Sequence, residues 1–428
     1  MDDLLLVAGS PAHYRLAILR PPVVLLAGQR KVLVPLYLTT LGTWSAYALI
    51  VVVLPFRFEA LGLSVVEYGI ALAIYALGLL ATEGLWGYLA FQLGSARSLG
   101  ALAVAAVVSM VALGFARSFV MFCVLLGVYG MLVVYSTPLI RWLGMTASGR
   151  GRASQGLGLL GLFFGLGLSA GTTVGPLLYS LGGFWLNVYV GTAVFAVSTI
   201  PLLLIPWGSV SLPRTLSSGL SPIRALFERR FALASVLVVL YFMIYTLVTN
   251  FLQYYSIDLF HGTVDEAGYV IGGARGVALV SGVLLGSVVD RWGAHRAAPL
   301  GFLLLGGGAI GTWISVNYAE MTLCTVASAI GAGWLSVTLL PMALSRIDPE
   351  HQGTAVGVFG SFEDLGLILG PLLLGVVYSS MGARELFPVV AGLALGAFLL
   401  AIPGRASLPS LTSRWGSNHP PPGREPSP

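Results

Sequence analysis

Charged residues are scarce in this chain. They make up 9% of its 428 residues, against about 25% in a soluble globular domain. A water-soluble protein of this length needs a polar surface, and the chain has too few charges to form one. Hydrophobic residues make up 57% of the sequence, so the solvent left for this apolar surface is lipid. The composition excludes a soluble domain and indicates an integral membrane protein.

Cysteine and histidine are also rare, with two and five residues. Cys123 and Cys324 both lie in apolar runs, so no disulfide framework or metal site is predicted, and we expect no cofactor. All five histidines lie outside the apolar segments, whereas a membrane-embedded enzyme would need a cluster of His, Asp or Glu near one face. The net charge of +5 comes from basic residues scattered through short loops. A membrane explains this pattern better than nucleic acid does, and we expect no nucleic-acid partner.

Twelve apolar segments approach the length of about 20 residues that a helix needs to cross a bilayer. Each must be helical, because lipid offers no partner for backbone N–H and C=O groups. A β-barrel is rejected, since the segments are apolar on all faces instead of alternating. The expected spans are 32–54, 66–90, 98–116, 118–141, 154–178, 185–206, 231–255, 267–289, 297–317, 321–344, 353–378 and 385–404.

Lys and Arg fall mainly on one side of these spans, as they do on the cytoplasmic side of membrane proteins. With the N-terminus inside, eighteen of the 22 basic residues are cytoplasmic. Only Arg57, Arg117 and Arg384 would lie outside, and Arg275 lies within the eighth span. We therefore expect both termini in the cytoplasm and the protein in the plasma membrane.

The longest internal loop, 207–230, divides the spans six and six and is read as a cytoplasmic linker. It separates an N-terminal bundle, 31–206, from a C-terminal bundle, 231–405. Residues 1–30 contain no apolar run long enough to span and are expected to form an interfacial or loose leader. The Pro/Ser-rich tail, 406–428, is expected to be disordered.

The two halves echo one another in sequence. Glycine, glycine and arginine recur at the same spacing in Gly87–Arg97 and Gly286–Arg296, with an offset of 199 residues. Gly171–Pro176 in the fifth span and Gly366–Pro371 in the eleventh share a G-x-x-x-G-P pattern, with an offset of 195. Such repeats predict an all-α membrane protein of about twelve transmembrane helices in two pseudo-symmetric six-helix bundles.

One of these repeats resembles the signature of a known family. The stretch G-x-x-x-D-R-x-G-x-x-R is similar to the loop between the second and third spans of major facilitator superfamily proteins, which recurs between the eighth and ninth. Its residues here are Gly286, Asp290, Arg291, Gly293 and Arg296. The resemblance covers about residues 30–405 and implies a secondary carrier that works by alternating access.

The resemblance further implies that this turn is a cytoplasmic gate. The carboxylate of Asp290 would face the positive end of a neighbouring helix dipole. The alternative is a solvated turn that carries positive-inside charge. The first-half copy departs from the family pattern, with Phe91 and Gln92 where Asp and Arg are usual.

The G-x-x-x-G-P pairs place two glycines one helical turn apart, so helices can approach closely, and the proline then loosens the backbone. A hinge or sliding interface and plain helix packing are both consistent with this pattern. In the resembled family, the fifth-span version is associated with antiporters. The residues are Gly171, Gly175, Pro176, Gly366, Gly370 and Pro371.

Charges inside spans are costly and usually functional. The spans contain Glu83, Arg275 and the adjacent pair Glu363 and Asp364. At 1.5 Å per residue, Arg275 and Asp364 both lie roughly 13 Å from the outer face. A buried carboxyl favours its protonated form and can exchange a proton. The acidic pair, with Asp364 favoured over Glu363, is therefore the predicted site of proton coupling, and Glu83 is the next candidate. The alternative is a structural ion pair with Arg275.

Polar and aromatic residues also gather on the first, fourth, seventh and tenth spans, which line the central cavity of the resembled family. The candidate cavity residues are Thr40, Trp44, Tyr47, Tyr135, Tyr241, Tyr245, Asn250, Gln253 and Trp334. Aromatic residues are also ordinary constituents of membrane helices, so a structural role is the alternative for each of them.

The sequence thus predicts a monomeric carrier that moves a small organic solute, coupled to protons, within membrane lipid. Efflux of an amphipathic compound is slightly favoured by the aromatic lining and the Gly-Pro motif. Uptake of a sugar or organic acid, with or without coupling, is the alternative. A membrane-embedded enzyme and a channel are the rivals from other classes.

Overall fold

The structure is a computed structural model. It describes residues 27–93, 96–137, 139–140, 143, 153–205, 229–345, 347 and 352–402. Helices are the only regular secondary structure in these ranges. The leader up to residue 26, linker residues 207–228 and the tail 406–428 lie outside the described residues.

The N-terminal half supplies the first six apolar helices. Its elements are α1 (Ala27–Val51), α2 (Leu54–Ala60), α3 (Val65–Leu93), α4 (Ala96–Gly114), α5 (Phe119–Val133) and α7 (Ala153–Leu203). The long α7 is two helices joined at Gly182 and Gly183, whose backbone leaves the helical region, with φ of +67° at Gly183. A side chain would be strained at that angle, so glycine allows the chain to reverse there.

The C-terminal half supplies the remaining six. Its elements are α9 (Arg229–Thr246), η3 (Leu247–Phe251), α10 (Leu252–Phe260), α11 (Val264–Trp292), α12 (Ala294–Ile314), α13 (Tyr318–Ser336), α14 (Leu339–Leu344), α15 (Gln352–Met381), η4 (Ala383–Glu385) and α16 (Leu386–Ala401). Within the described ranges, nine helical stretches are long and apolar enough to cross a membrane, and α4 and α5 are shorter apolar helices. With α7 counted as two helices, the total is twelve, and the predicted all-α membrane fold is confirmed.

Two helices expected to be continuous are interrupted, each about four residues before a proline. Helix α1 ends at Val51 and Pro55 follows in α2, while α13 ends at Ser336 and Pro341 follows in α14. A proline ring clashes with the carbonyl four residues earlier and cannot donate to it. The seventh span contains no proline and is instead loosened by the π-helical turn η3.

The internal repeat extends to the helix caps. Ser64 and Glu67 form reciprocal hydrogen bonds at the start of α3, and Thr263 and Glu266 form the same capping box at the start of α11. The two caps are 199 residues apart, like the glycines and arginine of the loops that follow these helices. Each cap satisfies backbone N–H groups at a helix start.

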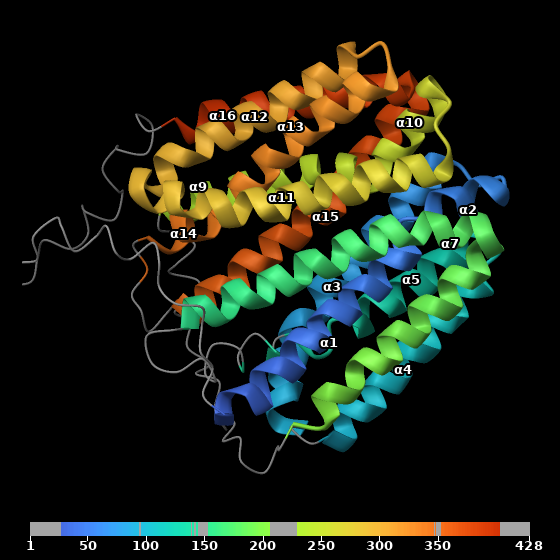
Figure 1. Cartoon of the computed structure of the whole chain (residues 1–428), viewed down its shortest axis with the longest axis vertical. Helices are drawn as coiled ribbons and strands as arrows, with labels where there is room; N and C mark the ends of the chain where they lie inside the picture. The colour runs from blue at the N-terminus through green and yellow to red at the C-terminus, as the bar shows by residue number, and fades with distance from the viewer. Residues whose placement is uncertain are drawn as a thin grey trace, which may run out of the picture.

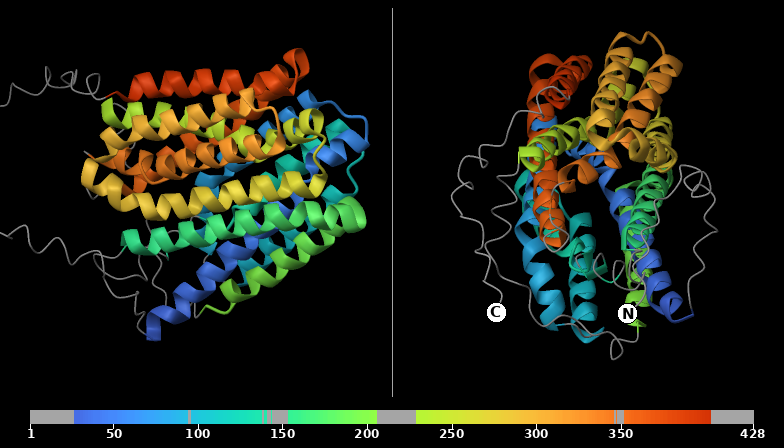
Figure 2. Two further views of the ribbon diagram at one scale, coloured as in Figure 1. Left: turned by 45° about the horizontal axis from the view of Figure 1, so that its top comes forward. Right: turned by 90° about the vertical axis from the view of Figure 1, so that its left-hand side faces the viewer.

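Two groups of helices lie side by side in Figures 1 and 2, the first half in blue to green and the second in yellow to red. Within the first half, α7 packs along α1 and α3 packs against α5; within the second, α15 packs along α9 and α13 against α12. The halves meet along two seams, α3 with α15 and α7 with α11. A candidate site between the halves must lie next to these seams.

Candidate transport site

The glycines of the two Gly-Pro motifs pack against the first helix of their own half. A Cβ at Gly171 would meet the Ser45 carbonyl of α1, and a Cβ at Gly366 would meet α9. Side chains larger than hydrogen would therefore separate these helices. The plain packing that the sequence left open is present at these glycines.

The prolines of the same motifs contact the opposite half. A Cβ on Gly268 of α11 would overlap the ring of Pro176, and a Cβ on Gly69 of α3 would overlap the carbonyl of Pro371. Gly69 and Gly268 are 199 residues apart, so the two contacts are related by the internal repeat. We call the end of the molecule where these contacts lie the closed end.

The seam between α7 and α11 is also hydrogen-bonded near the closed end. Ser169 donates to the Gly272 carbonyl over 2.8 Å, and Ser180 donates to the Asp265 carboxylate over 3.3 Å. Nearer the other end of the helices, a Cβ at Gly161, Gly286 or Gly357 would meet nothing within 4 Å. The helices of the two halves diverge in that direction (Figure 1).

Arg275 lies on this seam, in the middle of α11. Its side chain is 9% exposed, and one guanidinium nitrogen donates to Thr172 Oγ1 of α7, so the bond joins the two halves. Its Nε has no hydrogen-bond partner in the described part of the chain. Arg275 stands out in the sequence as a charge within a span, whereas Thr172 is one of many hydroxyl residues in the spans.

The acidic pair lies on the other seam, in α15. Asp364 is 9% exposed and Glu363 is half-buried. Asp364 interacts electrostatically with Tyr75 of α3, and Glu363 with Tyr241 of α9. Adjacent residues on a helix point about 100° apart, so the two acids face different directions. The pairing of either with Arg275 stays a prediction.

Arg275 and Asp364 lie at the same depth below the closed end. Arg275 follows Gly268 by seven residues, and Asp364 precedes Pro371 by seven. At 1.5 Å per residue, each lies about 10 Å along its helix from an inter-half contact. The cation and the acid thus occupy comparable positions on the two seams.

Aromatic side chains lie beside these charges in the first half. Tyr47 of α1 stacks on Tyr75, with ring centroids 5.4 Å apart and planes at 23°. Trp44 packs edge-on against Tyr47 at 5.5 Å, and Tyr129 of α5 lies 5.8 Å from Tyr75. Arg275 interacts electrostatically with Tyr47. We call Tyr47, Tyr75, Arg275 and Asp364 the central cluster.

Tyr75 and Tyr68 belong to this region but were not predicted from the sequence. Both lie on α3 and both are buried. They are seven residues apart, which is about two helical turns and places them on one face. That spacing was the available signal, but a helix that is apolar all round gives no indication of which face is buried.

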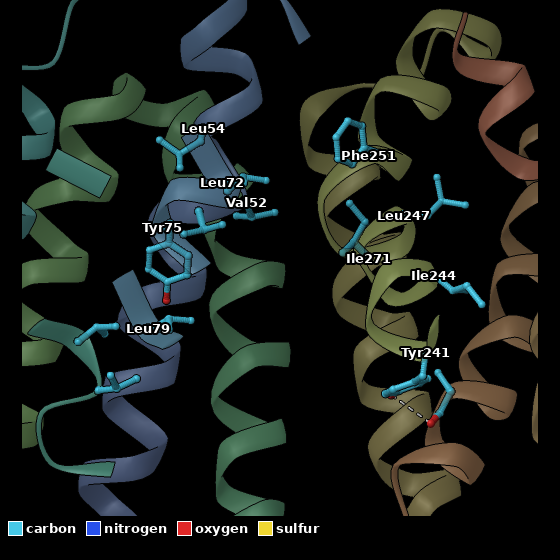
Figure 3. Close-up of a cluster of buried hydrophobic side chains, with 14 of the residues drawn as sticks. Val52, Leu54, Leu72, Tyr75, Leu79, Tyr241, Ile244, Leu247, Phe251 and Ile271 are labelled. Atoms are coloured by element: carbon cyan, nitrogen blue, oxygen red, sulfur yellow. Dashed lines mark hydrogen bonds between the residues drawn. The ribbon is translucent and has the colours of Figure 1, made fainter. Parts of the chain in front are cut away.

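The second half contributes a parallel set of aromatic and amide groups. Tyr241 and Tyr245 lie 5.9 Å apart on α9, and Tyr241 donates to the Ala332 carbonyl over 3.2 Å (Figure 3). The π-helical turn that follows contains Asn250, and the Gln253 amide donates to its carbonyl over 3.0 Å. Such turns often occur at functional sites.

Three predicted cavity residues lie apart from the central cluster. Thr40 donates to the Leu36 carbonyl of its own helix, and Tyr135 is fully buried. Trp334 belongs to a separate buried group with Val289 and packs against Trp292, with centroids 6.3 Å apart. None of the three has a described contact with the central cluster.

The predicted gate residues surround the turn between α11 and α12. Arg291 and Arg296 are exposed, and Gly293 adopts φ of +82°, an angle that favours glycine. Gly286 lies on α11 before this turn. The side chains of Asp290 and of Glu83 lie outside the described residues, so the gate and the role of Glu83 stay predictions.

Comparison with known proteins adds to this geometry. A drug efflux pump, JefA of Mycobacterium tuberculosis, is 30% identical over 139 residues, 32% of this chain and 26% of that protein. The riboflavin transporter RibZ of Clostridioides difficile is 22% identical over 139 residues, 32% of this chain and 30% of that protein. The regions matched in the first three relatives span 21%, 30% and 37% of their lengths.

Solved structures match over most of the chain. A bacterial homologue of the human lysosomal transporter Spinster, in an inward-facing and unoccupied conformation, gives a TM-score of 0.76 at 15% identity, over 88% of this chain and 97% of that one. The nucleoside transporter NupG gives 0.69 at 13% identity, over 86% and 98%. These similarities show the fold.

The family model of the Major Facilitator Superfamily matches residues 36–314 and 235–424, so the two matches together cover most of the chain. The family's members and the structural neighbours are transporters and not enzymes, as the sequence predicted. The repeated caps, the paired inter-half contacts and this match agree, and the chain belongs to the Major Facilitator Superfamily of membrane transporters.

Proposed function

We propose that this transporter is a proton-coupled carrier that exports a small amphipathic organic compound by alternating access. The observation that carries the proposal is the central cluster. A buried cation and a buried acid lie at one depth on the two seams, with stacked tyrosines beside them. Ionisable groups inside membrane spans are costly and usually mark substrate or proton pathways.

Alternating access requires the two halves, 31–206 and 231–405, to rock against one another while the linker 207–230 joins them. The inter-half contacts at the closed end support a conformation that is shut on one side of the cluster. With both termini in the cytoplasm, the closed end is external and the conformation faces inward. The protein works as a monomer in this proposal, because both seams belong to one chain.

Proton coupling is assigned to Asp364. Burial favours the protonated carboxyl, and the positive charge of Arg275 favours the ionised one. Tyr75 of α3 is among the polar groups that face Asp364 across the seam, and Glu363 is its neighbour on α15. Rocking changes the water access and the neighbours of Asp364, so it can bind a proton on one side and release it on the other.

Export is favoured over uptake by the Gly-Pro motif of the fifth span and by the partial similarity to JefA. The similarity to RibZ supports the alternative, uptake of a nutrient such as riboflavin. Cells that express the protein distinguish the two. Export lowers the cellular content of a loaded fluorescent compound such as fluorescein, whereas uptake raises the content of riboflavin.

The coupling is tested with purified protein in proteoliposomes under an imposed pH gradient, with fluorescein and riboflavin as probe solutes. The unmodified protein should accumulate a probe against its gradient. Asp364→Asn should abolish this accumulation and keep downhill exchange, because exchange needs no net proton movement. Glu363→Gln is the matched control and should retain accumulation. Normal gradient-driven accumulation in both variants would refute the assignment of the proton site.

A further inference from the structure

Arg275 has more hydrogen-bonding capacity than the described protein uses. A guanidinium carries five N–H donors and no acceptor. One nitrogen donates to the neutral hydroxyl of Thr172, and Nε has no partner although the side chain is buried. Burying a charged donor without partners is unfavourable. Nε of Arg275 is therefore available to a hydrogen-bond acceptor on a ligand.

The neighbouring tyrosines add further donors. Gly171, next to the Thr172 partner of Arg275, packs against Ser45 of α1, two residues from Tyr47. The hydroxyl of Tyr68 is buried and has no hydrogen-bond partner among the described residues. Donors from α11, α1 and α3 thus lie on neighbouring helices between the halves. A carboxylate, which has two oxygens and accepts several hydrogen bonds, complements such a region.

Apolar contacts lie next to these donors. The stacked rings of Tyr47 and Tyr75 continue into Trp44, which packs on Phe164 with centroids 4.5 Å apart. Trp44 and Tyr47 are both only half-buried, so part of each ring is available to a ligand. A planar apolar body can stack on such rings while its charged end reaches the arginine.

We infer that Arg275 is the anion-binding group of the substrate site, and that the transported compound is an amphipathic organic carboxylate. The inference rests on the proposed function, whose substrate class it narrows. An anion at Arg275 and a proton at Asp364 would each neutralise one of the two buried charges between the halves.

The test is a binding measurement, independent of transport. The melting temperature of the purified full chain is measured in the presence of 2-naphthoate, benzoate or decanoate. Each acid is compared with its methyl ester and with an amine that has the same hydrocarbon group. At equal concentrations, at least one acid should raise the melting temperature more than its ester and its amine.

Variants link the preference to the arginine. Arg275→Gln should weaken the binding of the acid about tenfold or more, the range expected for a lost hydrogen bond to a charged group. Arg275→Lys, which keeps the charge without the planar fork, should weaken it less. Arg117→Gln, at an exposed position, is the matched control and should leave binding unchanged. Thr172→Val should keep the preference for the acid.

Three results would overturn the inference: equal stabilisation by esters or amines, an intact acid preference in Arg275→Gln, or no stabilisation by any acid. If Arg275→Gln does not fold, the inference is tested with Arg275→Lys and Thr172→Val instead. Unchanged affinity for the acid in Arg275→Lys then counts against the inference. If the unmodified protein binds the acid but shows no proton-driven transport, the proposed function is refuted and the anion site is still supported.

Discussion

Adjacent glycines on α11 provide a sharp test of the closed end. A Cβ at Gly272 would overlap the Thr173 hydroxyl of α7 and lie 3.0 Å from the Thr173 backbone nitrogen, whereas a Cβ at Gly273 would meet nothing within 4 Å. Gly272→Ala should therefore push the halves apart at the closed end. Gly273→Ala adds the same methyl group to the same helix one residue later and should not.

The expected magnitude follows from the cost of overpacking, about 1–3 kcal/mol for an added methyl group that the surroundings cannot accommodate. The gain in helix propensity from Gly to Ala, up to about 1 kcal/mol, is common to both variants and to both conformations, so it cancels. A shift of 1–3 kcal/mol changes the ratio of the two conformations by about 5 to 150 times. The closed end should thus be open in a much larger share of Gly272→Ala molecules.

The assay is the distance between two spin labels across the closed end. Labels on cysteines introduced at Leu181, which is 72% exposed, and at His261, also exposed, report the separation of the halves. Cys123 and Cys324 are first replaced by serine, since they are the chain's only cysteines. Gly272→Ala should show a larger population at long distance than Gly273→Ala. Identical distributions in the two variants would refute the reasoning.

Three further predictions concern topology, gating and packing. Reporter fusions after residues 95, 148, 220, 294 and 349 should read cytoplasmic, and those after 60, 182, 262 and 382 external; two or more reversed positions would contradict the twelve-span topology. Asp290→Asn should sharply reduce transport at normal expression, because a gate charge acts on the conformational equilibrium. Full transport by this variant would indicate that Asp290 belongs to a solvated turn. The buried Asn187 amide donates to the Leu49 and Gly175 carbonyls over 2.8 and 2.7 Å. Asn187→Leu should therefore lower the stability measured by thermal unfolding by about 1–2 kcal/mol. An unchanged melting temperature would show that these hydrogen bonds do not stabilise the protein.

The sequence by itself determined the class of protein and the number of spans. Too few charges for a soluble surface left lipid as the solvent, and lipid requires helices. Repeats 199 and 195 residues apart determined the division into related halves. The prolines did not by themselves determine where helices break, since the chain is interrupted before Pro55 and Pro341 but helical through Pro176 and Pro371.

Only the tertiary structure decided which side chains meet. Thr172 as the partner of Arg275, and Tyr75 as the ring between Tyr47 and Asp364, depend on the rotation of each helix about its axis. That rotation has little signal in the sequence, because the lipid-facing and inward-facing sides of a membrane helix are similarly apolar. For the same reason the packing of Trp334 with Val289 and Ala297 was not predicted, and its role in the cavity stays a prediction.

Which end of the molecule is closed could also not be predicted from the sequence. Both conformations of a carrier are encoded by the same residues, and their relative free energies depend on contacts between helices far apart in the chain. Pro176 with Gly268 and Pro371 with Gly69 are such contacts. The glycine and proline patterns marked the helices that approach closely, but only the packing of the two halves decided which surfaces these residues touch.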